Sequence, residues 1–267
     1  PGLYGAGQFN GSSGYEEAAA QGLVAGINAA LKLQGKPPLV LTRGDGYVGV
    51  LIDDLVTKGT NEPYRMMTSR TEYRLIHRQD NADRRLAAYG HRAGLVSGAR
   101  LARIEEKYAA VEREIRRLEH TGAAPSPRLD GLLKEKGEPP CPHGARLIDL
   151  LRRPRLSYGD LSPFDPDRPA LAAEITEQVE ISVKYAGYID RQNRQVEELR
   201  RLEDRPLPPE VDYLGIQGLR LEARQKLDKI RPLNLGQASR VSGVSPADVA
   251  ALMIYLERGQ SCGNRDL

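Results

Sequence analysis

Apolar residues recur at helical spacing over most of the chain beyond about residue 62. Between residues 101 and 118 they follow one another at intervals of 3, 4, 3, 4 and 3, typical of the seam of a helix packed lengthwise on a partner. A comparable stripe follows residues 175–202. The two stripes consist of Leu101, Ile104, Tyr108, Val111, Ile115 and Leu118, and of Ile175, Val179, Val183, Ala186, Ile189, Val196, Leu199 and Leu202. We predict two long helices that pack antiparallel on each other.

The start of the chain has a different pattern. Residues 2–7 are apolar and glycine-rich, and we predict a short buried strand there. The small residues of 10–14 indicate a turn, and the alanine-rich stretch 15–33 indicates a helix that ends before Gly35, Pro37 and Pro38. This strand–turn–helix is an incomplete α/β unit.

The remaining segments are short. Prolines and turns make residues 121–170 a loop-rich connection with short helices such as 145–152, and Pro206, Pro208 and Pro209 mark a second boundary. Three short helices are expected beyond it, at 217–230, 235–241 and 246–258. We predict a mainly α fold in three pieces: residues 1–41, a helical domain over 42–205, and a small C-terminal helical module over 206–267.

Composition excludes two protein classes. No apolar run of the 267-residue chain approaches the roughly 18 residues that a membrane span needs, so we expect no membrane insertion. With 2 cysteines and no charged-then-apolar signal at the start, a reducing, cytoplasmic setting is expected. Hydrolase and NTPase signatures are missing, and Cys141 with His143 lacks a second ligand pair, so no metal site is expected.

Positive charge gathers in one part of the chain. The net charge is only +3, but residues 61–120 hold 13 Lys and Arg against 9 Asp and Glu. If the segment is helical, Arg70, Arg74 and Arg78 share one face suited to phosphate groups, with tyrosines beside them for base stacking. The alternative is a solvated face whose arginines pair with nearby acids. The residues concerned are Tyr64, Arg65, Arg70, Tyr73, Arg74 and Arg78, and the acids are Glu72, Asp80 and Asp83.

Two further features admit two interpretations each. The glycine turn before the helix at 15–33 could bind a phosphate or a flavin, because glycines allow close approach and a helix N-terminus presents unpaired amides. Its small residues could equally serve to let a helix lie close to a sheet. Asp53 and Asp54 could act as a base or a ligand, although such a pair more often caps a helix or faces water.

Several long motifs occur together and in order. They are GAGQFNGSSGYEEAAAQG at 5–22, DDL at 53–55, EPYRMMTSRTEYRL at 62–75, DNAD at 80–83, LLRRP at 150–154, EISVKYAGYI at 180–189 and GQASRVSGVSPA at 236–247. This set, which covers nearly the whole chain, closely resembles the MnmG (GidA) family of flavoproteins, the tRNA uridine 5-carboxymethylaminomethyl modification enzymes. The family's opening GxGxxG segment, NAD-binding region and redox cysteines have no counterpart here, so the chain resembles the C-terminal portion of such a protein.

The resemblance implies an enzyme that uses FAD, with NADH as reductant, to transfer a folate-derived one-carbon unit to C5 of the wobble uridine of tRNA. Glycine or ammonium completes the substituent. It also implies a homodimer that forms a heterotetramer with the GTPase MnmE. The C-terminal module would meet MnmE and contribute to tRNA binding. Residues 1–41 would then end an FAD-binding domain of the Rossmann type. The implied flavin-side residues are Gly7, Gln8, Asn10, Gly11, Gly14 and Tyr15.

The implied tRNA-binding residues are the six arginines and tyrosines named above, and no catalytic residue is assigned. The chain by itself is expected to be inactive, since the implied catalytic half is not in it. The alternative is that the chain as given is a non-catalytic module that binds tRNA and MnmE. A general flavin oxidoreductase of small molecules would leave the arginine-rich segment, residues 61–78, without a function.

Overall fold

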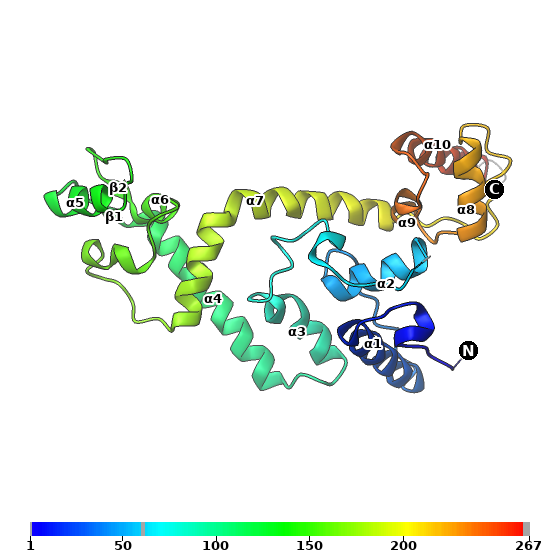
Figure 1. Ribbon diagram of the computed structural model, residues 1–267, viewed down its shortest axis with the longest axis horizontal. Helices are drawn as coiled ribbons and strands as arrows, with labels where there is room; N and C mark the ends of the chain where they lie inside the picture. The colour runs from blue at the N-terminus through cyan, green and yellow to red at the C-terminus, as the bar shows by residue number, and fades with distance from the viewer. Residues whose placement is uncertain (1, 60–61, 264–267) are drawn as a thin grey trace. The chain divides into compact units, whose positions relative to one another are not determined.

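The computed structural model describes residues 2–59 and 62–263, and the side chains of these residues except 258–263. Helices dominate this part of the chain, which confirms the mainly α prediction (Figure 1). The described α-helices are α1 (Tyr15–Leu33), α2 (Tyr47–Thr57), α3 (Ala82–Arg92), α4 (Gly98–His120), α5 (Pro127–Glu135), α6 (Leu147–Leu151), α7 (Ala173–Glu203), α8 (Leu221–Ile230), α9 (Leu235–Arg240) and α10 (Pro246–Gly263). Strands β1 (Gly122–Ala123) and β2 (Ala145–Arg146) pair antiparallel. None of the helices described is both long and apolar enough to cross a lipid bilayer.

The chain forms two compact units. The first combines Pro1–Arg74 with Gln192–Leu267, and the second is Leu75–Arg191. Helix α7 begins in the second unit and ends in the first. Segments from the two ends of the chain therefore belong to one unit.

In the first unit, α1 lies against α2, and α9 contacts both α2 and α10. Helix α1 begins after Gly14, has Glu16 and Glu17 in its first turn and Lys32 in its last, which suits the helix dipole at both ends. The C-terminal helices enclose an apolar core. It consists of Leu207, Val211, Tyr213, Ile216, Leu219, Leu227, Leu235, Ala238, Val241 and Leu252.

The strand predicted at residues 2–7 is wrong. Residues 2–6 have no regular structure, and Gly7–Asn10 form a short 3-10 helix, η1. Leu3 is 95% exposed, so the segment is not buried as predicted. A strand depends on hydrogen bonds from a neighbouring strand, and within the described residues this segment pairs with none.

The second unit surrounds a separate core. Helices α4 and α5 each begin at a serine cap: the side chain of Ser97 accepts from the amide of Arg100 at 3.3 Å, and that of Ser126 from Leu129 at 3.2 Å. The core contains Val111, Leu118, Ala123, Leu129, Leu133, Leu147, Ile148, Leu150, Leu151, Leu156, Tyr158, Leu161, Val179 and Val183.

The predicted long helices exist, but they do not pack lengthwise on each other. The main helical partners of α4 are α3 and α6, and α7 contributes Val179 and Val183 to the same core. The stripe of α7 is divided: its first part enters this core, whereas Leu202 packs on the core of the first unit. Helical spacing predicts a buried face, and here several short elements, rather than one long partner, cover that face.

Candidate functional site

The six expected cofactor residues lie together: five are in the loop that leads into α1, and Tyr15 is the first residue of that helix. Gly7 and Gly11 have φ angles of +75° and +80°, a region that favours glycine. A Cβ atom at Gly7 would lie 3.3 Å from the Cβ of Ala18, so the loop sits close against the helix. The side chains of Gln8 and Tyr15 are exposed.

Gln21, on the second turn of α1, fixes the shape of this loop. Its Oε1 accepts from the amide of Gly7 at 3.0 Å and from Nδ2 of Asn10 at 2.9 Å, and its Nε2 donates to Oγ of Ser12 at 2.8 Å. Gln21 is 5% exposed. Sequence reasoning did not assign it a role; a polar amide in an alanine-rich helix was the available signal.

The loop geometry fits a cofactor edge. The residue before α1 is Gly14, which has no side chain to cap the helix, and the first amide that bonds back into the helix is that of Ala18, to the Gly14 carbonyl at 3.1 Å. The amides of Tyr15 and Glu16 therefore lie outside the helical ladder and can donate to a ligand, whereas the amide of Glu17 bonds to its own carboxylate. A partially negative oxygen or nitrogen of a flavin ring suits this end of a helix.

The arginine-rich segment is not helical, which corrects the shared face predicted for Arg70, Arg74 and Arg78. Only Thr68–Arg70 form a 3-10 turn, η2, and residues 71–81 are turns and bends. Arg65, Arg70 and Arg74 are exposed. Arg78, in the second unit, donates to Asp80 at 3.0 Å, as the alternative interpretation predicted.

Tyr64 and Tyr73 are each 5% exposed, so in this structure their rings are not accessible for base stacking. The hydroxyl of Tyr64 donates to Oδ2 of Asp54 at 2.8 Å, and the guanidinium of Arg70 lies 4.8 Å from the centre of the Tyr64 ring. Burial and the neighbouring Asp54 raise the pKa of Tyr64. The tyrosines support the segment from inside, and the arginines carry its exposed charge.

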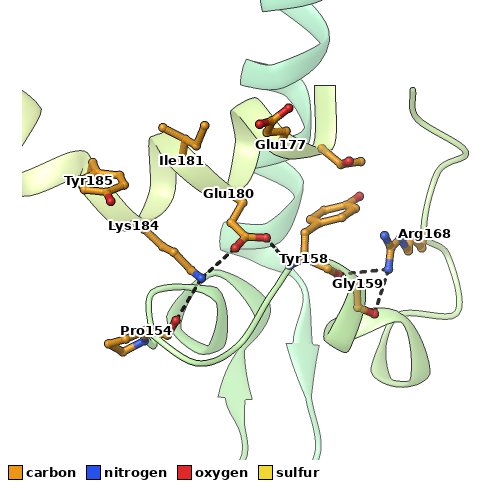
Figure 2. A pocket seen from close by; sticks show the side chains of 10 residues that line it. Pro154, Tyr158, Gly159, Arg168, Glu177, Glu180, Ile181, Lys184 and Tyr185 are labelled. Atoms are coloured by element: carbon orange, nitrogen blue, oxygen red, sulfur yellow. Dashed lines mark hydrogen bonds and ion pairs between the residues drawn. The ribbon is translucent and has the colours of Figure 1, made fainter. Parts of the chain in front are cut away.

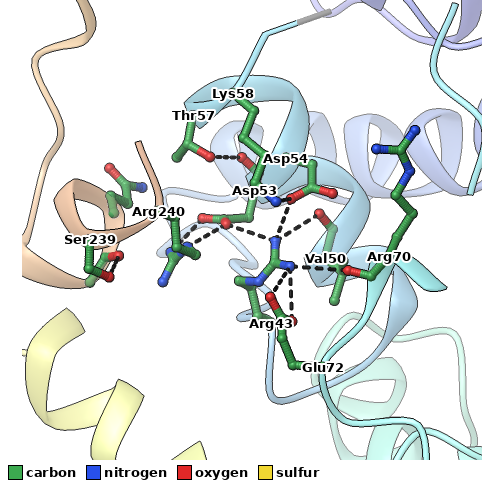
Figure 3. A network of polar contacts seen from close by, with 12 residues as sticks. Arg43, Val50, Asp53, Asp54, Thr57, Lys58, Arg70, Glu72, Ser239 and Arg240 are labelled. Carbon is green, nitrogen blue, oxygen red and sulfur yellow. Dashed lines mark hydrogen bonds and ion pairs between the residues drawn. The ribbon is translucent and has the colours of Figure 1, made fainter. Parts of the chain in front are cut away.

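Within the first unit, a buried arginine, Arg43, links α2 to the arginine-rich segment. It is 1% exposed and lies among three carboxylates (Figure 3). Its Nη1 donates to Asp54 at 2.7 Å and to Asp53 at 3.0 Å, and its Nη2 donates to Glu72 at 2.8 Å. Sequence reasoning missed Arg43, because a single arginine before a glycine-rich stretch gives no signal of burial.

Asp53 and Asp54 are thus neither helix caps nor solvent-facing residues. Asp54 is 1% exposed, and Nζ of Lys58 lies 2.8 Å from its Oδ1. Burial by itself would raise the pKa of Asp54, but the hydrogen bonds from Lys58, Tyr64 and Arg43 outweigh burial and lower it. Asp53 accepts a hydrogen bond from the guanidinium of Arg240, the last residue of α9. Both carboxylates are structural partners of arginines rather than candidate bases.

The second unit contains a pocket in which Lys184, Glu180 and Arg168 already have partners (Figure 2). Lys184 donates to Glu180 at 2.8 Å and to the carbonyl of Pro154 at 3.3 Å, and Glu180 accepts from the amide of Tyr158 at 2.9 Å. Arg168 donates to the carbonyl of Tyr158 at 3.1 Å. These contacts engage three of the pocket's charged side chains, and the described residues hold no His, Cys, Asp and Glu cluster suited to a metal.

Comparison with known proteins identifies the family of the chain. Residues 98–193 match the model of the tRNA modifying enzyme MnmG/GidA C-terminal helical domain, and residues 195–266 match that of the MnmG/GidA C-terminal helical bundle. Residues 1–37 match the model of glucose inhibited division protein A. The chain belongs to the MnmG/GidA family.

Curated relatives carry the same name. The chain is 56% identical over 257 residues to the tRNA uridine 5-carboxymethylaminomethyl modification enzyme MnmG of Clostridium botulinum (strain Okra), covering 96% of this chain and 41% of that protein. It is 52% identical over 259 residues to the MnmG of Exiguobacterium sibiricum, with 97% and 41% covered. The chain thus spans about two fifths of the length of these MnmG relatives.

A solved MnmG/GidA structure has the same fold. The structure of Aquifex aeolicus GidA in the form II crystal has a TM-score of 0.81 and 41% sequence identity, over 96% of this chain and 40% of that chain. The structure of the same protein in the form I crystal has a TM-score of 0.76 and covers 94% of this chain and 38% of that chain. The family to which this chain belongs is therefore one of tRNA-modifying enzymes.

Proposed function

We propose that this chain is the part of a flavin-dependent tRNA-modifying enzyme that closes the flavin site and binds the tRNA. The whole enzyme would use FAD, with NADH as reductant, to add a carboxymethylaminomethyl or aminomethyl group to C5 of the wobble uridine, the one-carbon unit coming from a folate. A bound flavin would supply the redox chemistry. The proposal rests on the family and on one observation: the loop before α1 and the arginine-rich segment are joined by hydrogen bonds.

The joining contacts are backbone to backbone. The amide of Tyr64 donates to the Gly11 carbonyl at 2.7 Å, and the amide of Ser13 donates to the Tyr64 carbonyl at 3.0 Å. A ligand edge at Gly7–Tyr15 and a nucleic acid at Arg65 and Arg70 would therefore meet at the same place. This juxtaposition is what a flavoenzyme acting on RNA needs, because the reacting base must reach the flavin.

The arginines would supply affinity for the tRNA. Arg65, Arg70 and Arg74 would contact phosphates or flanking bases, and Arg78 would contribute less because Asp80 already binds it. Tyr64 and Tyr73 would act from the interior by supporting this segment. No catalytic residue is proposed within the chain.

The C-terminal helices would meet the GTPase MnmE, in a complex of an MnmG homodimer with an MnmE dimer in the cytoplasm. Apolar side chains on these helices and their connections are exposed, as expected of a surface that binds another protein. They are Leu214, Leu221, Leu233, Ile254 and Tyr255.

The experiment that tests this function is a titration of the chain with a tRNA that has a wobble uridine, at two salt concentrations, with an MnmE titration as the control for folding. Tight, salt-dependent binding of tRNA would support recognition by this part of the enzyme. If the chain bound MnmE but not tRNA, the tRNA-binding role would be contradicted, and the chain would act only as a docking module for MnmE. A flavin absorption spectrum of the purified chain tells whether it holds FAD by itself.

A further inference from the structure

Glu17 is the one side chain of α1 whose carboxylate bonds to the arginine-rich segment. Its Oε1 accepts from the amide of Met66 at 2.5 Å, and the residue is 4% exposed. The position suits a carboxylate, because it lies in the first turn of a helix. A Cβ atom built on Gly14 would lie 1.7 Å from its Oε2, so the carboxylate fills the space beside Gly14.

The contacts of Glu17 and of the loop bracket Arg65 on both sides. Tyr64, the residue before it, is bonded to Gly11 and Ser13, and Met66, the residue after it, is bonded to Glu17. The side chain of Arg65 is exposed. The backbone at Arg65 is thus held from the same loop and helix end that would receive the flavin.

Each of these two segments lacks a regular structure of its own that would fix it. The loop at Gly7–Gly14 contains one short 3-10 helix, and the segment from Glu62 to Arg74 contains one 3-10 turn. Segments of this kind depend on contacts with neighbours for their order. A ligand that further stabilises the loop would therefore also stabilise the segment, and the converse follows.

Glu17 is suited to holding the segment rather than to proton transfer. The hydrogen bond from the Met66 amide lowers the pKa of Glu17, outweighing the effect of burial. The carboxylate is therefore ionised at neutral pH and acts as an acceptor. Its Oε2 is buried and has no hydrogen-bond partner in the described part of the chain, so the Met66 amide is its one bonded neighbour outside α1.

We propose that Glu17 is a positioning residue that couples cofactor binding to RNA binding: with FAD in the loop, the Glu17–Met66 contact holds Arg65 in place for tRNA. This inference rests on the proposed function. By thermodynamic linkage, the factor by which FAD tightens tRNA binding must equal the factor by which tRNA tightens FAD binding.

The test uses a protein of the relatives' full length that carries this sequence, and measures the dissociation constant of tRNA with and without saturating FAD. The parent is expected to bind tRNA at least about five-fold more tightly with FAD, the lower end of ordinary coupling. In Glu17→Ala the factor is expected to fall to about one, with both ligands still bound. Glu16→Ala, which removes an exposed carboxylate from the same turn, should keep the parent's factor.

Glu17→Gln supplies a second, milder variant. Its amide oxygen can still accept from the Met66 amide, so we expect a coupling factor between those of the parent and Glu17→Ala. This variant keeps the test valid if Glu17→Ala destabilises the fold. Measuring FAD affinity with and without tRNA in each variant checks the cycle, because the two factors must agree. A merely structural loss would weaken the binding of each ligand alone, whereas a loss of coupling leaves the single-ligand dissociation constants close to the parent's. The inference is overturned if the parent binds both ligands without coupling, or if Glu17→Ala retains the parent's factor. A parent that fails to bind FAD or tRNA contradicts the proposed function itself, and this inference with it.

Discussion

The guanidinium of Arg240 donates two hydrogen bonds, of 2.7 and 2.6 Å, to the carboxylate of Asp53, 187 positions earlier in the chain. It also lies 3.0 Å from Glu203 at the end of α7. Asp53 in turn accepts from Arg43, which bonds to Asp54 and so, through Tyr64, to the loop before α1. The C-terminal helices and the proposed cofactor loop therefore share one polar network within the first unit.

Replacing Arg43 by Met should cost about 3–5 kcal/mol of unfolding free energy, the usual result of removing one partner from a buried ion pair. Asp53, Asp54 and Glu72 would remain close together without the positive charge of the guanidinium that lies between them. Urea unfolding followed by circular dichroism measures the change. Arg113→Met on α4, an exposed arginine that pairs with the exposed Glu106, is the matched control and should change stability by less than about 0.5 kcal/mol. Equal effects of the two substitutions would contradict the role of Arg43.

Asp248 should make the stability of the C-terminal helices depend on pH. Hydrogen bonds from Arg220, at 2.7 Å, and from the amide of Ser245, at 2.8 Å, lower the pKa of this carboxylate well below its usual range. A lowered pKa in the folded state stabilises above the ordinary Asp value near 4, and this stabilisation is lost as the pH falls below that value. Urea unfolding between pH 6 and pH 3 should show the loss. Asp248→Asn should lower stability at neutral pH by about 1–3 kcal/mol and flatten that dependence, and an unchanged slope would rule out this contribution.

Arg65→Ala and Arg74→Ala should each weaken tRNA binding and reduce the slope of log K against log salt by about one, because each would remove one phosphate contact. Both side chains are exposed. Arg113→Ala is again the control and should leave the slope unchanged. Slopes identical to the parent's in both variants would mean that these arginines do not face the RNA.

Gln8→Ala should lower FAD affinity in a protein of the relatives' full length. Gln8 is exposed on the loop whose shape Gln21 maintains, so its removal should cost ligand contacts without changing the fold. Flavin fluorescence on titration measures the dissociation constant. Gln34→Ala, an exposed amide beyond the end of α1, is the control. Full retention of flavin by Gln8→Ala would remove Gln8 from the proposed site.

Leu221→Ser should weaken MnmE binding, since this leucine of α8 is 68% exposed on the C-terminal helices. Leu95→Ser, at a leucine 61% exposed in the second unit, is the control for a general loss of apolar surface. Titration of MnmE into each variant compares them. A larger effect of Leu95→Ser would place the contact elsewhere.

The amino-acid sequence by itself determined the helical character of the chain, because helical periodicity and capping residues are local properties. Helix α1 has the predicted bounds, and α4, α7 and the C-terminal helices lie within a few residues of theirs. The family also followed from the sequence, since long motifs in a fixed order are read without a structure. The clustering of Gly7, Gln8, Asn10, Gly11, Gly14 and Tyr15 was likewise predictable, because they are neighbours in the chain.

Only the tertiary structure decided how the charged and aromatic residues are used. Spacing placed Arg70, Arg74 and Arg78 on a helix, but the segment instead takes its hydrogen bonds from the loop before α1 and from Glu17. Tyr64 and Tyr73 became interior residues, and the buried Arg43 became the centre of a network with Asp54 and Glu72, 11 and 29 positions away. Burial of a charge depends on partners brought in from distant parts of the chain, and no local pattern records which partners will meet.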